Sequence, residues 1–222
     1  LIILSVVTAA AALQAAGGMD YLVNVAARIL RSRPGQITFL GPLVTYFFTL
    51  FAGTAHISYS IMPIIAEVAT KARIRPERAM SMSVTAAHMG ITASPVSAAS
   101  AALLTVLAAS GVQLADILMV CIPSTLVGVI IGILFVWKKG KELDKDPEFL
   151  EKMKDPAFAK SISDDQNGAA LTLRPGAKKS VIIFALAVLS VVILGSFPTL
   201  LPKFNISEGF EPGFALNDSG QV

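Results

Sequence analysis

The stretch Gly90-Ile91-Thr92-Ala93-Ser94-Pro95-Val96-Ser97 interrupts a long apolar segment that runs from residue 79 to residue 109. Pro95 has no backbone N–H and disfavours helical conformation at the residue before it, so a continuous helix is not expected. In the hydrocarbon core of a bilayer, broken backbone persists only where protein buries it or where it lines an aqueous cavity. Because the break also carries three hydroxyl side chains, it predicts a ligand site at mid-membrane depth.

The composition is that of a membrane protein. The 222 residues are 54% hydrophobic and 15% charged, whereas soluble domains carry about 25% charged residues. Residues 117–137 and 181–201 are each apolar over about the 20 residues that a spanning helix needs. Cys121 is the only cysteine and lies inside the first of these segments. An intrachain disulfide is therefore excluded, and we expect neither a metal nor another cofactor.

The start of the chain is apolar from its first residue. Residues 1–16 have no preceding basic region, and the glycines that follow suit a helix end better than a cleavage site. We therefore expect these residues to be the remainder of a spanning helix, and the chain to be a fragment of a longer protein.

The positive charges indicate a topology. Residues 28–33, 71–78 and 138–180 together contain seventeen of the eighteen lysine and arginine residues. The positive-inside rule assigns all three groups to the cytoplasm. Residues 37–69 must then leave the cytoplasm and return to it, although each arm is short for a span. This pattern predicts a re-entrant helical hairpin with its tip at Gly53-Thr54-Ala55-His56, and two short tilted spans are the alternative.

The apolar segment 79–109 must cross the membrane once under this topology. As one straight helix it would measure about 46 Å, well beyond a hydrocarbon core of about 30 Å. A break at residues 90–97 removes the excess and leaves two half-helices. The sequence thus predicts an all-α polytopic membrane protein with a re-entrant hairpin and a discontinuous transmembrane helix.

The remaining segments have simpler roles. Residues 19–31 form an amphipathic helix that is expected to lie along the cytoplasmic interface. Residues 1–137 would hold the transmembrane helices, 138–180 a solvated cytoplasmic connector, 181–201 another transmembrane helix and 202–222 a polar external tail.

Half-helices that begin inside a membrane are suited to anion binding. Their first N–H groups are unpaired and carry a partial positive charge. Residues after His56 and after Pro95 would begin such half-helices, hydroxyl groups would add donors, and glycines would let the backbone approach a ligand. Two donor clusters would suit a dicarboxylate. The candidate substrate-binding residues are Gly53, Thr54, His56, Ser58, Gly90, Thr92, Ser94, Pro95 and Ser97.

Other interpretations of these residues remain open. Small and hydroxyl residues in membrane helices often serve close helix packing alone. Ser81, Thr85, His88 and Thr92 share one helical face. His56 could bind ligand, relay protons or hydrogen-bond a neighbouring helix, whereas His88 is more simply a structural residue.

Enzymatic and nucleic-acid functions have little support. The sequence contains no H-E-x-x-H or G-x-S-x-G motif, and its basic groups are not interleaved with aromatic residues. We keep two alternatives to transport: a membrane scaffold or sensor partner that does not transport, and an intramembrane hydrolase that uses Ser94 or Ser97 with His88.

Several ordered motifs also resemble a known family. They are Phe51-Ala52-Gly53-Thr54-Ala55-His56, Met62-Pro63-Ile64-Ile65-Ala66-Glu67-Val68-Ala69, Arg75-Pro76-Glu77-Arg78, residues 90–97 and Ile122-Pro123-Ser124-Thr125-Leu126. With these motifs the sequence resembles the anaerobic C4-dicarboxylate transporters of the DcuA/DcuB family. One departure is Ala55, where the family usually has glycine.

The resemblance implies a multi-pass carrier of the bacterial inner membrane. Such carriers exchange external fumarate, malate or aspartate for internal succinate, and can also take up dicarboxylate with protons. Family members are longer, so this chain would be the N-terminal half of an inverted-repeat carrier. The implied partners are a C4-dicarboxylate, membrane lipid, the missing C-terminal half, and a second copy or a sensor kinase.

Overall fold

The computed structural model describes residues 2–107, 110–140, 142–157 and 174–196, and within these ranges all regular structure is helical. The all-α prediction is confirmed for these residues. The expected external tail and the middle of the expected connector lie outside them. The helices are α1 (Ile2–Ala15), α2 (Gly18–Ser32), α3 (Ile37–Ala52), α4 (His56–Lys71), α5 (Pro76–Thr92), α6 (Ala98–Leu107), α7 (Leu114–Val136), α8 (Pro147–Lys152) and α10 (Ala177–Ser196), with 3₁₀ turns η1 (Pro34–Gln36) and η3 (Leu143–Lys145).

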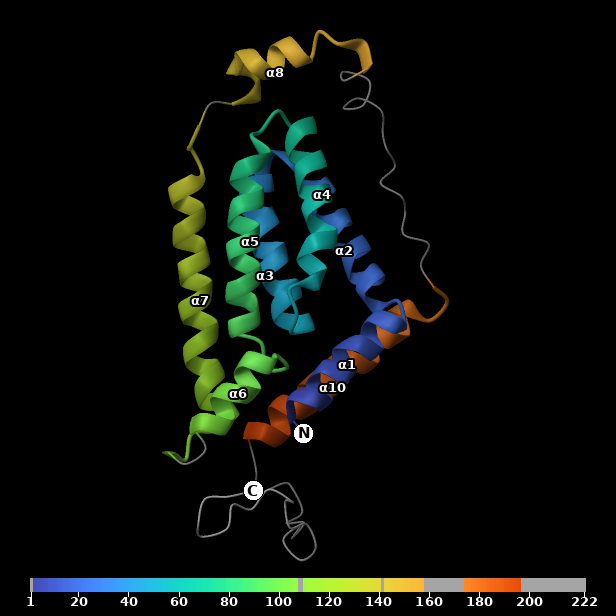
Figure 1. The fold of residues 1–222 in the computed structure, drawn as a ribbon, viewed down its shortest axis with the longest axis vertical. Helices are drawn as coiled ribbons and strands as arrows, with labels where there is room; N and C mark the ends of the chain where they lie inside the picture. The colour runs from blue at the N-terminus through green and yellow to red at the C-terminus, as the bar shows by residue number, and fades with distance from the viewer. Residues whose placement is uncertain (1, 108–109, 141, 158–173, 197–222) are drawn as a thin grey trace, which may run out of the picture.

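Helix α5 occupies the centre of the bundle. It packs against α3, α4 and α7, and Figure 1 shows it in front of α3 with α4 and α7 on its two sides. Helices α1 and α10 run alongside each other at an oblique angle to this bundle, and α6 contacts both α1 and α7. The predicted discontinuous helix corresponds to α5 followed by α6, and its first part, α5, is the central helix of the described fold.

Small residues allow α3 and α5 to approach closely. A Cβ atom on Gly90 would lie 2.6 Å from the Tyr46 carbonyl oxygen and closer still to the Thr49 hydroxyl. A Cβ atom on Gly41 would lie 3.3 Å from the Ser83 hydroxyl oxygen. Glycine at these two positions brings the helix backbones together, as is common where membrane helices pack.

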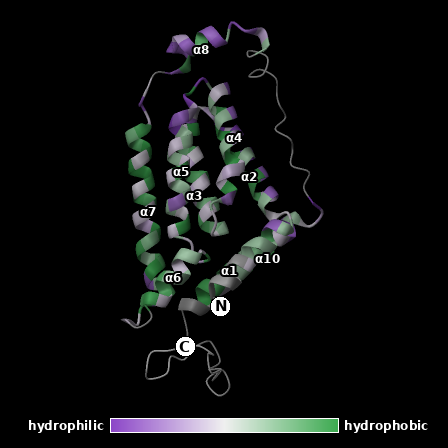
Figure 2. Cartoon of the chain, viewed as in Figure 1, coloured by the Kyte–Doolittle hydropathy of each residue, from purple (hydrophilic) through white to green (hydrophobic). Residues whose placement is uncertain are grey.

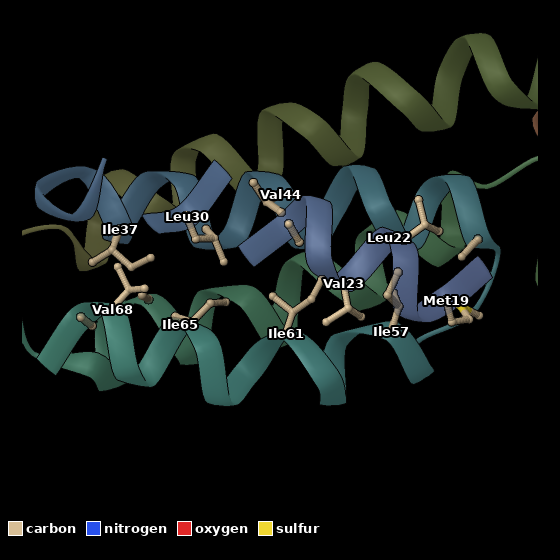
Figure 3. Packing of buried hydrophobic residues seen from close by; sticks show 14 of the residues in the cluster. Met19, Leu22, Val23, Leu30, Ile37, Val44, Ile57, Ile61, Ile65 and Val68 are labelled. Atoms are coloured by element: carbon tan, nitrogen blue, oxygen red, sulfur yellow. The ribbon is translucent and has the colours of Figure 1, made fainter. Parts of the chain in front are cut away.

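The largest hydrophobic core joins α2, α3 and α4. Figure 3 shows a row of α4 side chains, Ile57, Ile61, Ile65 and Val68, facing apolar side chains of α2 and α3. The apolar side of α2 is buried in this core. The amphipathic pattern of residues 19–31 thus reflects packing against protein, in contrast to the interfacial helix that the pattern alone predicts.

Two helices are long and apolar enough to cross a membrane, among the residues that the structure describes. They are Pro34–Ala52, which extends α3 by the turn η1, and Leu114–Val136, which is α7. Figure 2 shows α7 as predominantly hydrophobic along its length. The span expected at 117–137 has its counterpart in α7. Residues 37–69, where the hairpin was expected, form α3 and α4 joined by a turn at residues 53–55.

Arg78 joins the start of α5 to the end of α7. Its side chain is 6% exposed, and its guanidinium group donates hydrogen bonds to the carbonyl oxygens of Trp137, Lys139 and Gly140. It also pairs with the Glu142 carboxylate at 2.7 Å. Carbonyl oxygens at and beyond a helix end lack an N–H partner in the next turn, so they need donors from elsewhere.

Residues that follow Glu142 make further contacts with the α4–α5 loop. Arg75 pairs with Asp146 at 3.1 Å, and the guanidinium carbon of Arg73 lies 5.4 Å from the centre of the Phe149 ring. Leu143, in the turn η3, is buried and its N–H donates to the Arg73 carbonyl. The first part of the connector is therefore docked on the α4–α5 loop, in contrast to the solvated linker expected from its charge.

Candidate functional site

The predicted break is present but shorter than expected. Helix α5 continues to Thr92 and α6 begins at Ala98, so the break comprises residues 93–97. The prediction that it starts at Gly90 was wrong. The N–H groups of Ala93 and Ser94 still donate to carbonyls of the last turn of α5, at 3.1 Å each. The helical pattern stops at Pro95, which has no N–H to donate.

Serine hydroxyls satisfy the backbone of the break from within. Ser97 lies just before α6, and its hydroxyl accepts a hydrogen bond from the Ser100 N–H at 3.1 Å, which is an N-cap. The Ser100 hydroxyl donates to the Ser94 carbonyl oxygen at 2.6 Å, and the Ser94 hydroxyl accepts from the Val96 N–H. Ser94 and Ser97 are completely buried. These two predicted donors therefore hold the shape of the break.

Ser100 was not identified from the sequence, although it completes this network. Its spacing of three residues from Ser97 is the N-cap to N3 spacing of a helix start. This spacing could have identified Ser100 from the sequence. It was overlooked because the residues around Ser100 are apolar and indicate only a helix.

The hairpin tip is a tight turn of three residues between α3 and α4. Gly53 ends α3 with φ of +68°, and its N–H donates to the Thr49 carbonyl oxygen at 2.8 Å. This left-handed conformation is the usual glycine helix cap. His56 is the first residue of α4, so it belongs to the helix start and not to the turn.

The polar side chains of the tip differ in exposure. The Thr54 hydroxyl accepts a weak hydrogen bond from the His56 N–H at 3.4 Å, and Thr54 is half-buried. Ser58 is buried and its hydroxyl donates to the Ala55 carbonyl oxygen at 2.6 Å. The His56 side chain is exposed beside the Tyr59 ring. His56 and Thr54 are thus the tip side chains that a ligand could reach.

The hairpin tip and the helix break touch each other. A Cβ atom on Gly53 would lie 2.7 Å from the Val96 carbonyl oxygen and 3.0 Å from a Val96 methyl carbon. Only glycine permits this approach. The two irregular segments that the sequence singled out are therefore adjacent in the fold, although they are far apart along the chain. Gly90 lies elsewhere, buried against α3.

The end of α5 presents exposed polar groups next to the break. Thr92 is exposed, and its hydroxyl donates to the His88 carbonyl oxygen at 3.1 Å. His88 is also exposed, and its Nδ1 lies 2.9 Å from the Val84 carbonyl oxygen in the same helix. The hydrogen bond of this ring thus stays within α5, which does not support a role in fixing a neighbouring helix.

The hydrolase alternative finds no support in this geometry. The Ser94 and Ser97 hydroxyls are buried and engaged in hydrogen bonds within the break. Within the described ranges, the ring nitrogen contact of His88 is to a backbone carbonyl and not to a serine. Nucleophilic catalysis would need a serine whose proton the histidine could take.

The fold and the break define an all-helical membrane protein with a discontinuous helix, an arrangement that secondary transporters use at their binding sites. Residues 1–214 match the family described as anaerobic C4-dicarboxylate membrane transporter. The chain belongs to this family, and the resemblance seen in its motifs is confirmed. No solved structure significantly matches the chain.

Curated relatives extend the comparison. The chain is 43% identical to the C4-dicarboxylate transporter DcuA of Wolinella succinogenes over 192 residues, which are 86% of this chain and 43% of the relative. It is 39% identical to the anaerobic C4-dicarboxylate transporter DcuB of Escherichia coli O157:H7 over 213 residues, 92% of this chain and 47% of the relative. The chain therefore spans less than half the length of these relatives.

Proposed function

We propose that this chain belongs to a secondary carrier that moves C4-dicarboxylates across the bacterial inner membrane. It would exchange external fumarate, malate or aspartate for internal succinate, and could couple uptake to protons. Family membership and the names of the relatives support the substrate class. One structural observation supports the site: the hairpin tip and the helix break are in contact through Gly53 and Val96.

The proposed binding region combines two helix starts. Helix α4 begins at the tip and α6 begins after the break, so both helix starts, with their partial positive charge, lie in the same part of the fold. Thr54, His56 and Thr92 would contact the dicarboxylate, since their side chains are at least partly exposed. The buried members of the predicted set would position the backbone; they are Ser58, Gly90, Ser94 and Ser97.

A single half-site does not complete such a carrier. The remaining length of the relatives would add a second, inverted set of breaks that faces this one. Movement of the hairpin and the broken helix against that second set would give alternating access. A homo-oligomer or a sensor kinase would be further partners, and neither is needed for the binding chemistry described above.

Counterflow of labelled succinate against external fumarate tests this proposal in the full-length carrier. Thr92→Ala removes an exposed hydroxyl beside the break, and we expect it to reduce exchange by about tenfold, the value of one lost hydrogen bond to a charged ligand. Thr105→Ala is the matched control. Its hydroxyl also donates to its own helix, at 2.9 Å, but it lies in the last turn of α6, at the end away from the break.

Each outcome has a distinct meaning. Exchange that falls in Thr92→Ala and persists in Thr105→Ala, at equal abundance, supports both the transport function and the site. If a carrier with both Thr92→Ala and Ser94→Ala exchanges succinate at the rate of the parent, the proposed site is wrong. An abundant parent that exchanges no dicarboxylate contradicts the transport function and favours the scaffold or sensor alternative.

A further inference from the structure

One face of α5 is largely polar and is not covered by any other described helix, although α5 is the central helix of the bundle. Helices α3, α4 and α7 cover its other sides. In Figure 1 the side of α5 that lies away from α3 points toward the viewer, between α4 and α7. The exposed polar side chains of α5 are Glu77, Ser81, Thr85, His88 and Thr92, and the exposed apolar side chains Val84 and Met89 lie among them. The opposite side of the same helix is buried, at Ala79, Met82, Ser83, Ala86, Ala87 and Gly90.

The open face of α5 differs in chemistry from a surface that contacts lipid. Most exposed side chains in the second half of α7 are large and apolar, including Val127, Ile131 and Leu134, and Figure 2 shows α5 as paler and more purple than α7. A histidine inside a membrane is costly unless it faces a protein interior or an aqueous cavity. The position of His88 on this face therefore argues against a lipid environment for it.

Helix packing does not explain this face either. The side of α5 that packs closely on α3 uses alanine, serine and glycine, as close membrane contacts require. The open face instead carries larger side chains, among them Thr85, His88 and Val84, which is 48% exposed. These side chains would keep another helix at a distance and leave room for water.

The polar groups on this face keep hydrogen-bonding capacity for water. The Thr85 hydroxyl donates to the Ser81 carbonyl oxygen at 3.2 Å, which leaves its oxygen lone pairs available. The 2.9 Å contact between His88 Nδ1 and the Val84 carbonyl oxygen places the ring proton on Nδ1. His88 Nε2 is therefore directed away from this bond, and in protonated histidine it is a cationic donor suited to a carboxylate.

The face runs the length of α5. One end is next to the α4–α5 loop, where Arg75 is paired with Glu77 and Asp146. The other end is Thr92, which adjoins the break and so the proposed binding region. A strip of exposed polar side chains therefore leads from the loop end of α5 to the proposed binding region.

We propose that the open face of α5 lines the aqueous path by which the dicarboxylate reaches the binding region, and that His88 contacts a carboxylate of the passing substrate through Nε2. This inference rests on the proposed transport function for the identity of the substrate. The path itself rests on the exposure and polarity of Ser81, Thr85 and His88. His88 thereby becomes a substrate-contacting residue that the sequence had indicated as structural.

Cysteine accessibility tests the path in the full-length carrier after its native cysteines, including Cys121, are replaced by serine. Single cysteines at Ser81, Thr85 and His88 are treated with a charged methanethiosulfonate reagent, which reacts with the thiolate in water. Val127→Cys and Ile131→Cys on α7 are the lipid-facing controls. We expect at least about tenfold faster reaction on α5 than on α7, because thiolates do not form in hydrocarbon.

Substrate protection separates the path from the transport function. Succinate at saturating concentration should slow the reaction at position 85, where His88 is intact, and leave the two α7 positions unaffected. Equal reaction rates on α5 and α7 would overturn the path while succinate exchange could still stand. Fast reaction on α5 in a carrier that exchanges no dicarboxylate and shows no protection would keep an aqueous path and overturn the proposed substrate.

Substitutions at His88 test its contact with substrate. His88→Gln keeps a neutral hydrogen-bonding group, so we expect the KM for succinate to rise several-fold while the maximal rate stays near that of the parent. His88→Leu removes hydrogen bonding altogether, so exchange should fall to background at equal abundance. An unchanged KM in His88→Gln together with normal exchange in His88→Leu would overturn the assigned contact.

Discussion

Replacing Arg78 by alanine should release the segment that follows α7 from the α4–α5 loop. The guanidinium group holds three carbonyl oxygens at the end of α7 and beyond it, together with the Glu142 carboxylate. These four acceptors belong to one short stretch of chain, so a single side chain anchors that stretch. The α4–α5 loop would keep the weaker contacts that Arg73 and Arg75 make with residues farther along the connector.

The size of the effect follows from the geometry. Hydrogen bonds to a charged group contribute about 1.5–3 kcal/mol each, and such contributions are not additive within one side chain. Arg78 is 6% exposed, whereas the Glu142 side chain is 47% exposed and remains partly hydrated, so the ion pair itself adds little. A net loss of about 2–3 kcal/mol is expected, which corresponds to an opening equilibrium raised about 30- to 150-fold.

Thiol labelling measures this opening directly. Leu143 is buried in the docked segment, so Leu143→Cys should react with a maleimide only when the segment detaches. Arg78→Ala should accelerate that reaction about 30- to 150-fold. Arg28→Ala removes an exposed arginine from α2 and is the charge-matched control. Glu148→Cys, at an exposed position of α8, reports the rate of a thiol that needs no opening.

Glu142→Gln provides an intermediate case, because the three carbonyl contacts of Arg78 remain. We expect it to accelerate labelling by less than about tenfold. A change of less than about threefold in Arg78→Ala, with Glu148→Cys unchanged, would refute the conclusion that Arg78 holds the segment. An equal acceleration by Arg28→Ala would show that net charge, and not the hydrogen bonds, controls the opening.

Three further substitutions test the packing of the candidate site. Gly90→Ala places a methyl group against the α3 backbone, and overpacking of about 1–3 kcal/mol should lower the melting temperature. Gly128→Ala, whose new methyl group meets open space, should not lower it, and equal melting temperatures for both variants would contradict the close α3–α5 contact. Gly53→Ala strains a residue with positive φ and pushes the tip away from the break. We therefore expect the counterflow rate to fall by a larger factor than the amount of protein in the membrane. A counterflow rate equal to that of the parent would show that this contact is not important. Ser97→Ala removes the N-cap of α6 at a cost of about 1 kcal/mol, which should lower the melting temperature. Ser124→Ala, which removes an exposed mid-helix hydroxyl from α7, is its control, and equal melting temperatures for these two serine variants would refute the capping role.

The sequence determined the features that depend on neighbouring residues. Hydropathy and low charge required helices in a membrane, because lipid offers no partners for free backbone groups. Pro95, next to Gly90 and several hydroxyl residues, favoured a break close to its own position because its missing N–H removes a helical hydrogen bond. Proline alone did not decide this, since Pro42, Pro63 and Pro123 lie inside continuous helices. The ordered motifs at residues 51–56 and 90–97 also indicated the family that the comparisons show.

Tertiary structure alone decided how these features are used. Whether a serine contacts ligand or backbone depends on what surrounds it, and Ser94 and Ser97 proved to be buried in the network of the break. The contact of Gly53 with Val96, and the hydrogen bonds of Arg78 to the end of α7, join residues far apart in the chain. Local rules cannot specify such pairs, because the pairs arise only when whole helices pack and exclude one another's volume.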